Sequence, residues 1–176
     1  RIRLLLPVFD AVQSAHEKKI IHRDIKPANV LVTPQGVPKL LDFGVAKLLD
    51  ASAAPSAATQ LARLPFTPRY ASPEQIDAQA VTVRTDVYGL GVLAYELLVG
   101  ESPFACFAPA AIRDGGAAGT MTPWQALDAL RRAVPRRASV VAASALPAHA
   151  RALRGDLETI LARAIAPDAT ARYTSV

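Results

Sequence analysis

The eight residues 22–29 constrain this chain most, because they gather charged and polar side chains (His-Arg-Asp-Ile-Lys-Pro-Ala-Asn) in a sequence that is half apolar. Two short β-like runs follow at residues 29–33 and 38–41, and the Pro-Gln-Gly sequence of residues 34–36 predicts a turn between them. Asp42 comes directly after the second run. The pattern therefore sets a polar loop and a carboxylate at the two ends of a short β-like unit.

The residue types at these two places match one kind of chemistry. Asp24 supplies a carboxylate five positions before the amide of Asn29, and Lys26 supplies a cation between them. Asp42 adds a second carboxylate in front of a Phe-Gly pair. A base, a cation and two oxygen ligands for a metal are the equipment of phosphoryl transfer from ATP.

The net charge of +5 raises the question of nucleic-acid binding. The arginines are scattered, with doublets at residues 131–132 and 136–137, and no aromatic residues are interleaved with them. This distribution indicates an ordinary solvated surface, and we expect no nucleic-acid partner. The histidines show no metal-ligand spacing with Cys106.

No apolar run is long enough to span a bilayer, because the best candidate, residues 87–100, is short and contains Glu96. Cys106 is the single cysteine, so no internal disulfide can form, which fits a reducing compartment. The sequence opens on Arg1 rather than Met and shows no targeting segment. We therefore expect a piece of a longer protein.

Apolar residues at helical spacing predict a helix over residues 4–15. Proline is tolerated in the first helical turn, so we expect the ordered helix to begin near Pro7. Residues 19–21 look like a further β-like run. Residues 49–63 are rich in Ala, Ser and Pro, show no periodicity and predict a loop, and residues 138–150 are a second low-complexity stretch.

Three further helices are expected. Residues 87–98 form a strongly apolar run that Gly100 would end. Residues 123–134 place their large apolar side chains on one helical face. Residues 157–165 predict an amphipathic helix with Asp156 as its N-cap.

Five motifs in order resemble those of eukaryotic-type serine/threonine protein kinases in their bacterial form. Residues 22–29 resemble the catalytic loop of that family, and Asp42-Phe43-Gly44 resembles its metal-binding motif. The other three are residues 68–74, which resemble the end of the activation segment with Ser72 in place of alanine, residues 85–92, which resemble the central buried helix of the large lobe, and residues 168–173, which resemble the last arginine motif.

The resemblance implies an α+β protein-kinase-like fold, with a mostly α-helical large lobe, a few short β-strands and no small lobe. The domain would cover residues 1–176, with the catalytic loop at 22–29 and the activation segment at 42–74, truncated at both ends. The sequence contains no G-x-G-x-x-G loop and no strand lysine of the Val-Ala-Ile-Lys type. We therefore expect these residues alone to bind Mg-ATP weakly and to be inactive.

The resemblance also assigns roles to site residues. Asp24 would orient the substrate hydroxyl and accept its proton, and Lys26 would offset charge near the γ-phosphate. Asn29 and Asp42 would bind Mg²⁺, with Mn²⁺ as an alternative. Leu31 would lie under the adenine ring, so that it joins Lys26, Asn29 and Asp42 as a residue that contacts ATP.

Three residues are implied in regulation. Arg23 marks family members that are switched on by phosphorylation of the activation loop, because a phosphate can pair with an arginine. Ser52, Ser56 and Thr59 are the candidate acceptors, of which Thr59 is favoured. Thr67 stands where the family has a threonine that touches the catalytic aspartate and lysine, which indicates serine/threonine specificity.

Other matches imply structural roles. His22 and Phe43 resemble members of the hydrophobic spine that joins the two lobes of a kinase. Glu74 and Arg172 resemble a buried ion pair, and Asp86 resembles a helix-start aspartate that accepts hydrogen bonds from the backbone of the catalytic loop.

The sequence thus predicts part of an ATP-dependent protein serine/threonine kinase that works in the cytoplasm, free or as the cytoplasmic part of a membrane-anchored kinase. Its partners would be protein substrates and the small lobe of its own chain. One alternative is a pseudokinase or scaffold, although all four polar catalytic residues are present. Another is a small-molecule phosphotransferase of the aminoglycoside or choline type, which residues 72–74 disfavour.

Overall fold

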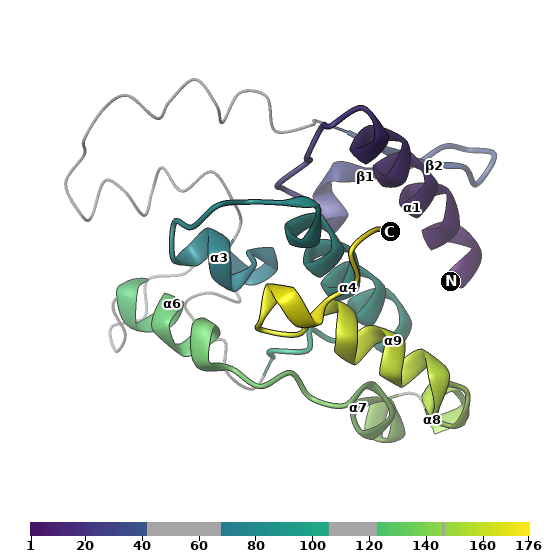
Figure 1. Ribbon diagram of the computed structural model, residues 1–176. Helices are drawn as coiled ribbons and strands as arrows, with labels where there is room; N and C mark the ends of the chain where they lie inside the picture. The colour runs from purple at the N-terminus through teal and green to yellow at the C-terminus, as the bar shows by residue number, and fades with distance from the viewer. Residues whose placement is uncertain (42–67, 106–122, 146) are drawn as a thin grey trace.

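The computed structural model describes residues 1–41, 68–105, 123–145 and 147–176, and within them it is mostly helical (Figure 1). In chain order the elements are α1 (Ile2–Glu17), the 3₁₀ turn η1 (Pro27–Asn29), β1 (Val30–Val32), β2 (Pro38–Leu40), the 3₁₀ turn η3 (Pro68–Tyr70), α3 (Pro73–Ile76), α4 (Val83–Val99), α6 (Pro123–Arg132), α7 (Ala138–Ala145), α8 (Pro147–Leu153), α9 (Asp156–Ala164) and the 3₁₀ turn η4 (Ala169–Ala171). Helices with a short β-hairpin confirm the expected α+β class.

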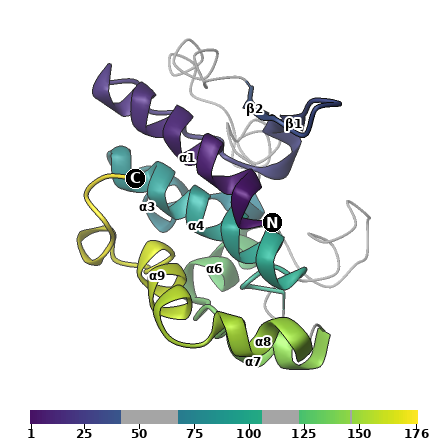
Figure 2. The same cartoon turned by 90° about the vertical axis from the view of Figure 1, so that its right-hand side faces the viewer.

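Helix α4 is the centre of the molecule. Every residue from 85 to 95 is buried, so the helix is covered on all sides rather than along one stripe. Thr82 caps its first turn, and Gly100 ends it in the left-handed conformation at φ 88°, as expected. Figures 1 and 2 show α1 packed on one side of α4 and α9 on another.

Helix α1 begins earlier than expected. It starts at Ile2 and passes through Pro7 in its second turn, so the expected start near Pro7 is wrong. Pro7 has no N–H to donate to the preceding turn. However, Leu5 and Val8 on either side of it are buried at 4% and 2% exposure, and packing of this face outweighs the missing bond.

Residues 19–21 form no strand, which corrects that expectation. The Lys18 and Lys19 N–H groups return to the carbonyls of Ala15 and His16, at 3.0 and 2.8 Å, and Lys19 has φ 61°. The closing turn of α1 therefore uses these residues to satisfy its last carbonyl groups.

The predicted hairpin is confirmed. Strands β1 and β2 pair antiparallel, with Val30 opposite Leu40 and Val32 opposite Pro38. Gly36 takes φ 80° in the turn, a conformation that glycine adopts without strain. The hairpin packs on α1 and carries the chain from residue 29 to residue 41.

Residues 138–150, which stand in the sequence only as a low-complexity stretch, contribute to two helices, α7 and α8. The carboxylate of Glu158 on α9 accepts hydrogen bonds from Ser139 N and Ser139 Oγ, at 3.1 and 2.7 Å. This acidic group at the start of α7 favours the helix through a tertiary contact, since the helix dipole is positive there. The side-chain hydrogen bond from Ser139 also holds the pKa of Glu158 below its ordinary value.

The two other expected helices form, as α6 and α9. The N-cap of α9 is Gly155 and Asp156 is its first helical residue, so the expected Asp156 cap is wrong. Gly91 of α4 lies against the end of α9, where an added Cβ would come within 2.7 Å of Ile165 and 2.8 Å of Ala164. Only glycine permits this close approach. The loop expected at residues 49–63 lies outside the described residues.

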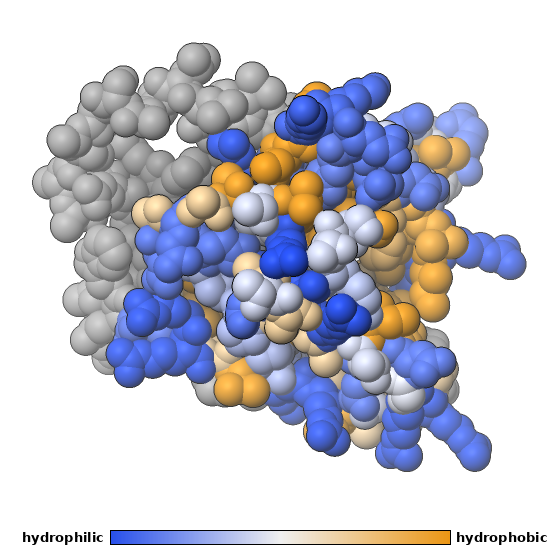
Figure 3. All heavy atoms as spheres, viewed as in Figure 1, coloured by the Kyte–Doolittle hydropathy of each residue, from blue (hydrophilic) through white to orange (hydrophobic). Residues whose placement is uncertain are grey.

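Hydrophobic side chains reach the surface between α1, α4 and α9, where they line an apolar groove of about 510 Å³. Ile2, Leu6 and Ile160 in this groove are about half exposed. Figure 3 shows hydrophobic residues in orange among the hydrophilic surface in blue. Among the helices that the structure describes, none has the length and apolarity to cross a membrane.

Candidate active site

The 22–29 loop connects α1 to β1 and ends in the turn η1. Pro27 begins this turn, where its missing N–H costs no helical hydrogen bond. The turn buries Asn29, of which 9% of the surface is exposed. The loop is thereby anchored at both ends to elements of regular structure.

Three predicted site residues meet in this loop. Lys26 Nζ lies 2.9 Å from Asp24 Oδ2. Asn29 Nδ2 donates to the Asp24 carbonyl at 2.7 Å and to Asp24 Oδ2 at 3.1 Å. The Asp24 and Lys26 side chains are 11% and 21% exposed. A carboxylate, an ammonium group and an amide are therefore held together at a partly open surface.

His22 links this loop to the end of the hairpin. Its side chain is fully buried, and its Nδ1 accepts from the Asp24 N–H at 3.3 Å. The ring proton is therefore on Nε2, which donates to the Leu41 carbonyl at 2.9 Å. The Leu41 N–H in turn donates to the Asn29 carbonyl at 2.8 Å. Asp42, which follows, lies outside the described residues.

Arg23 is held in a strained conformation. Its φ is 70°, a value that costs a residue with a side chain about 1–3 kcal/mol and persists only where the surroundings impose it. The Asp86 carboxylate accepts the His22 and Arg23 N–H groups, each at 2.8 Å. The predicted contact of Asp86 with the loop backbone is confirmed, and it supplies part of this restraint.

His16 is a contact that sequence reasoning missed. Its Nε2 lies 2.8 Å from Asp86 Oδ2, and its ring is 5% exposed. The signal in the sequence is the place of His16 on the buried side of the first helix, one turn from Val12. Asp86 thus joins α1, α4 and the 22–29 loop.

The remaining predicted residues are spread more widely. Leu31 lies on β1 opposite Lys39 and is 56% exposed. Arg23 lies in the loop with a partly exposed side chain. Thr59 and Thr67, like Phe43, lie outside the described residues, so their roles stay predictions.

Helix α3 begins within the last two residues of the segment predicted to regulate the site, residues 42–74. Ser72 and Gln75 form a capping box at its start, in which each side chain accepts a hydrogen bond from the other's backbone N–H. The Gln75 side chain also reaches the loop, where its Nε2 donates to the Arg23 carbonyl at 2.8 Å. Sequence reasoning missed this contact, because nothing in the residue order relates positions 23 and 75.

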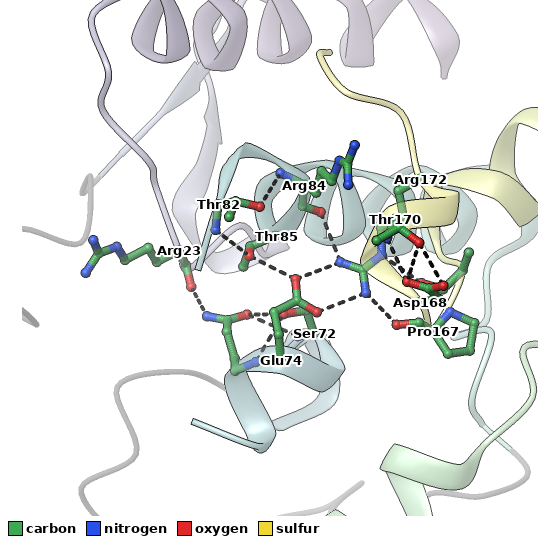
Figure 4. Close-up of polar contacts among 12 residues, drawn as sticks. Arg23, Ser72, Glu74, Thr82, Arg84, Thr85, Pro167, Asp168, Thr170 and Arg172 are labelled. Carbon is green, nitrogen blue, oxygen red and sulfur yellow. Dashed lines mark hydrogen bonds and ion pairs between the residues drawn. The ribbon is translucent and has the colours of Figure 1, made fainter. Parts of the chain in front are cut away.

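The predicted ion pair between Glu74 and Arg172 is confirmed (Figure 4). Arg172 donates to both Glu74 oxygens at 2.7 and 2.9 Å, and its other N–H groups reach the carbonyls of Ala166, Arg84 and Pro167. Thr85 Oγ1 also donates to Glu74, at 2.9 Å. All five guanidinium donors therefore have protein partners.

The charges of this pair are stabilised although both side chains are buried. Burial alone would raise the pKa of Glu74, but the hydrogen bonds from Arg172 and Thr85 hold that pKa below its ordinary value. The Arg172 guanidinium also lies 4.7 Å from the centre of the Tyr88 ring. Burial raises the pKa of Tyr88, so its hydroxyl stays neutral.

A second polar contact fixes the chain before α3. Glu96 on α4 accepts hydrogen bonds from Arg69 and from the Tyr70 hydroxyl, the latter at 2.7 Å. Burial and the bond to Glu96 raise the pKa of Tyr70. Two points on α4, Glu96 and Thr85, thus hold the two ends of the segment from η3 to α3.

Several curated bacterial kinases have sequences similar to this chain. A probable serine/threonine-protein kinase of Corynebacterium efficiens is 45% identical over 109 residues, which cover 62% of this chain and 16% of that protein. The serine/threonine-protein kinase PknB of Mycolicibacterium smegmatis is 39% identical over 111 residues, which cover 63% of this chain and 17% of that protein. The chain therefore matches less than a fifth of the length of these relatives.

Solved structures show the same fold. A crystal structure of the Mycobacterium tuberculosis PknI kinase domain, in a mutant form, aligns with a TM-score of 0.57 at 24% identity. The alignment covers 98% of this chain and 50% of that one. The sequence profile described as the protein kinase domain matches residues 2–174. Because this match takes in nearly every residue, the chain belongs to the protein kinase domain family.

Proposed function

We propose that this chain forms the catalytic large lobe of an ATP-dependent protein serine/threonine kinase. The single observation that carries the proposal is the cluster of Asp24, Lys26 and Asn29, in which a carboxylate oxygen lies 2.9 Å from an ammonium nitrogen and 3.1 Å from an amide nitrogen. The proposed domain has its catalytic loop at residues 22–29 and its activation segment at residues 42–74. The names of the bacterial relatives support the same activity.

Asp24 is the proposed base. A serine or threonine hydroxyl is a poor nucleophile, and a carboxylate at hydrogen-bond distance orients it and accepts its proton. Asn29 and Lys26 hold this carboxylate in one position. The fold therefore orients the base in advance, and the reaction does not have to supply the entropy cost of orienting it. Lys26 also offers a positive charge beside the group that is transferred.

The donor set fits a magnesium ion bound to phosphates. The nitrogen of the Asn29 amide donates to Asp24, so the amide oxygen is the atom that Asn29 can offer to a cation. Asn29 and Asp42 would hold Mg²⁺ or Mn²⁺, because hard cations prefer neutral and anionic oxygen ligands. The ion, when bound, neutralises charge on the phosphates. Leu31 on the exposed face of the hairpin would contact the adenine.

The proposed acceptors are proteins with serine or threonine side chains. Lys26 and Thr67 support this class through the resemblance, because Thr67 stands where serine/threonine kinases have a threonine and the tyrosine-specific branch replaces the region of Lys26 with an Ala/Arg pattern. Arg23 and Thr59 are the proposed regulatory pair, in which phosphorylated Thr59 would bind the arginine. The small lobe of the same kinase would complete the nucleotide site. Because the reaction consumes ATP, we place this lobe in the cytoplasm, either free or tethered to a membrane by another part of the protein.

Transfer from radiolabelled ATP in the complete kinase tests the proposal. Asp24→Asn should lower the rate of protein phosphorylation by about 100-fold or more, since a positioned base contributes about 10²–10⁴-fold. Asp10→Asn on the exposed side of α1 is the matched control and should keep the rate of the parent protein.

The acceptors in that assay separate the alternatives. Label on protein serine or threonine supports the proposal. Label on an aminoglycoside or choline, and none on protein, would replace it with a small-molecule phosphotransferase. ATP binding without transfer to any acceptor would replace it with a pseudokinase or scaffold.

A further inference from the structure

Both backbone groups of Arg23, its N–H and its carbonyl, make hydrogen bonds to side chains of other segments. Its N–H donates to Asp86 Oδ1 at 2.8 Å, and its carbonyl accepts from Gln75 Nε2, also at 2.8 Å. The dashed line at the Arg23 carbonyl in Figure 4 marks the second of these bonds. Because Arg23 stands at φ 70° without being glycine, contacts on both sides are needed to keep it there.

Gln75 is suited to this role because both ends of its amide are engaged. The amide oxygen accepts from Ser72 N at 3.1 Å and Ser72 Oγ at 3.2 Å, while the amide nitrogen donates to Arg23. The start of α3 therefore orients the side chain, and the side chain in turn holds the loop. These two parts of the chain are 52 residues apart in the sequence.

Gln75 holds the peptide that joins Arg23 to Asp24, because the Arg23 carbonyl and the Asp24 N–H share one plane. A rotation of this peptide would move the Asp24 carboxylate away from Lys26 and Asn29. Small displacements of a reacting group lower rates strongly. The hydrogen bond from Gln75 to the carbonyl and the hydrogen bond from the Asp24 N–H to His22 Nδ1 therefore restrain the two ends of this peptide.

We propose that Gln75 is a positioning residue that couples α3, the helix in which the activation segment ends, to the catalytic loop through the Arg23 carbonyl. The inference rests on the proposed function for its effect on rate, but its structural part concerns the loop alone. A change that disorders residues 72–75 would release Arg23 and misplace Asp24. The order of this short helix and the geometry of the base are thus linked.

Gln75→Glu separates the two contacts of this side chain. A glutamate still accepts from Ser72, as capping boxes allow, but it has no N–H for Arg23 and presents an oxygen to the carbonyl instead. Gln79→Glu is the matched control, since it makes the same chemical change on an exposed side chain four residues away. Both variants are made in the complete kinase.

We expect Gln75→Glu to lower kcat by about tenfold or more, with the KM for ATP and the melting temperature unchanged. Amide hydrogen exchange at residues 22–25 should be faster in this variant, while α4 stays protected. Gln79→Glu should match the parent protein in both measurements. A lower kcat with an unchanged KM for ATP and an unchanged melting temperature would not arise from a merely structural role.

Unchanged exchange at residues 22–25 in Gln75→Glu would overturn the inference, as would an unchanged kcat in an active kinase. If the parent protein transfers no phosphate, the proposed function fails, but the exchange measurement still decides the role of Gln75. If Gln75→Glu does not fold, Gln75→Met removes the donor without adding charge and is judged by the same two readouts.

Discussion

Two ion pairs of almost equal length lie in very different surroundings. Glu74 and Arg172 meet at 2.7 Å, with side chains that are 8% and 0% exposed. Asp24 and Lys26 meet at 2.9 Å, with side chains that are 11% and 21% exposed. Distance alone therefore does not distinguish them, but accessibility and hydrogen bonding do.

The difference separates a pair that is closed to other partners from a pair that is open to them. All N–H groups of the Arg172 guanidinium donate to protein atoms. Arg172 cannot change partner without leaving the buried Glu74 carboxylate unpaired. The ammonium group of Lys26 stands at a partly open surface, where a phosphate can compete for it. The first pair joins α3 to the segment after α9, and the second, Asp24 and Lys26, is the proposed working pair.

The largest effect on stability should come from the buried pair. Arg172→Met leaves Glu74 buried and without its partner, which should lower the free energy of unfolding by about 3–5 kcal/mol. Urea unfolding of the chain measures this. Arg131→Met, which breaks the exposed contact with Asp77 at 3.2 Å, is the control and should change stability by less than about 1 kcal/mol. Equal losses of unfolding free energy in Arg172→Met and Arg131→Met would contradict the difference between the buried and the exposed pair.

Acid should weaken the same pair by a smaller and graded amount. The pKa of Glu74 is depressed below its ordinary value of 4.5, so its contribution is fully present above that pH and is lost as the pH falls through the folded-state pKa. The difference in unfolding free energy between the parent chain and Glu74→Gln should therefore shrink below pH 4.5. A difference in unfolding free energy that stays constant as the pH falls below 4.5 would contradict an ionised Glu74 in this pair.

The smallest effect on stability should come from the working pair. Lys26→Met should change the free energy of unfolding by about 0–1 kcal/mol, because partly exposed pairs contribute little. In the complete kinase the same change should nevertheless lower phosphoryl transfer strongly, since a charge beside the transferred group is lost. Calorimetry and the transfer assay on one preparation test both halves. A variant that loses stability and keeps activity would reverse the comparison.

Much of this arrangement could be predicted from short motifs. The buried pair, the contact of Asp86 with the loop and the central helix were all expected from the resemblance, because each depends on residue types that stand in recognisable local patterns. The hairpin was predicted from its turn residues. Asp42 and Thr67 stay predictions, since they lie outside the described residues.

What the sequence did not predict depends on contacts between distant segments. Helix α7 was missed because its alanine-rich pattern lacks periodicity and a carboxylate from α9 caps its start. Helix α1 tolerates Pro7 because of packing that no propensity describes. His16 and Gln75 were missed for the same reason, since their partners lie 70 and 52 residues away.

The contact between Glu74 and Arg172 also has a consequence for the order of folding. The two residues are 98 positions apart, so their pairing closes a loop longer than half of these 176 residues. During synthesis, the carboxylate of Glu74 meets no guanidinium from Arg172 until those later residues have emerged. Contacts at such separation form slowly. This ion pair is thus expected to form late in folding, and α3 lacks this tertiary contact until it forms.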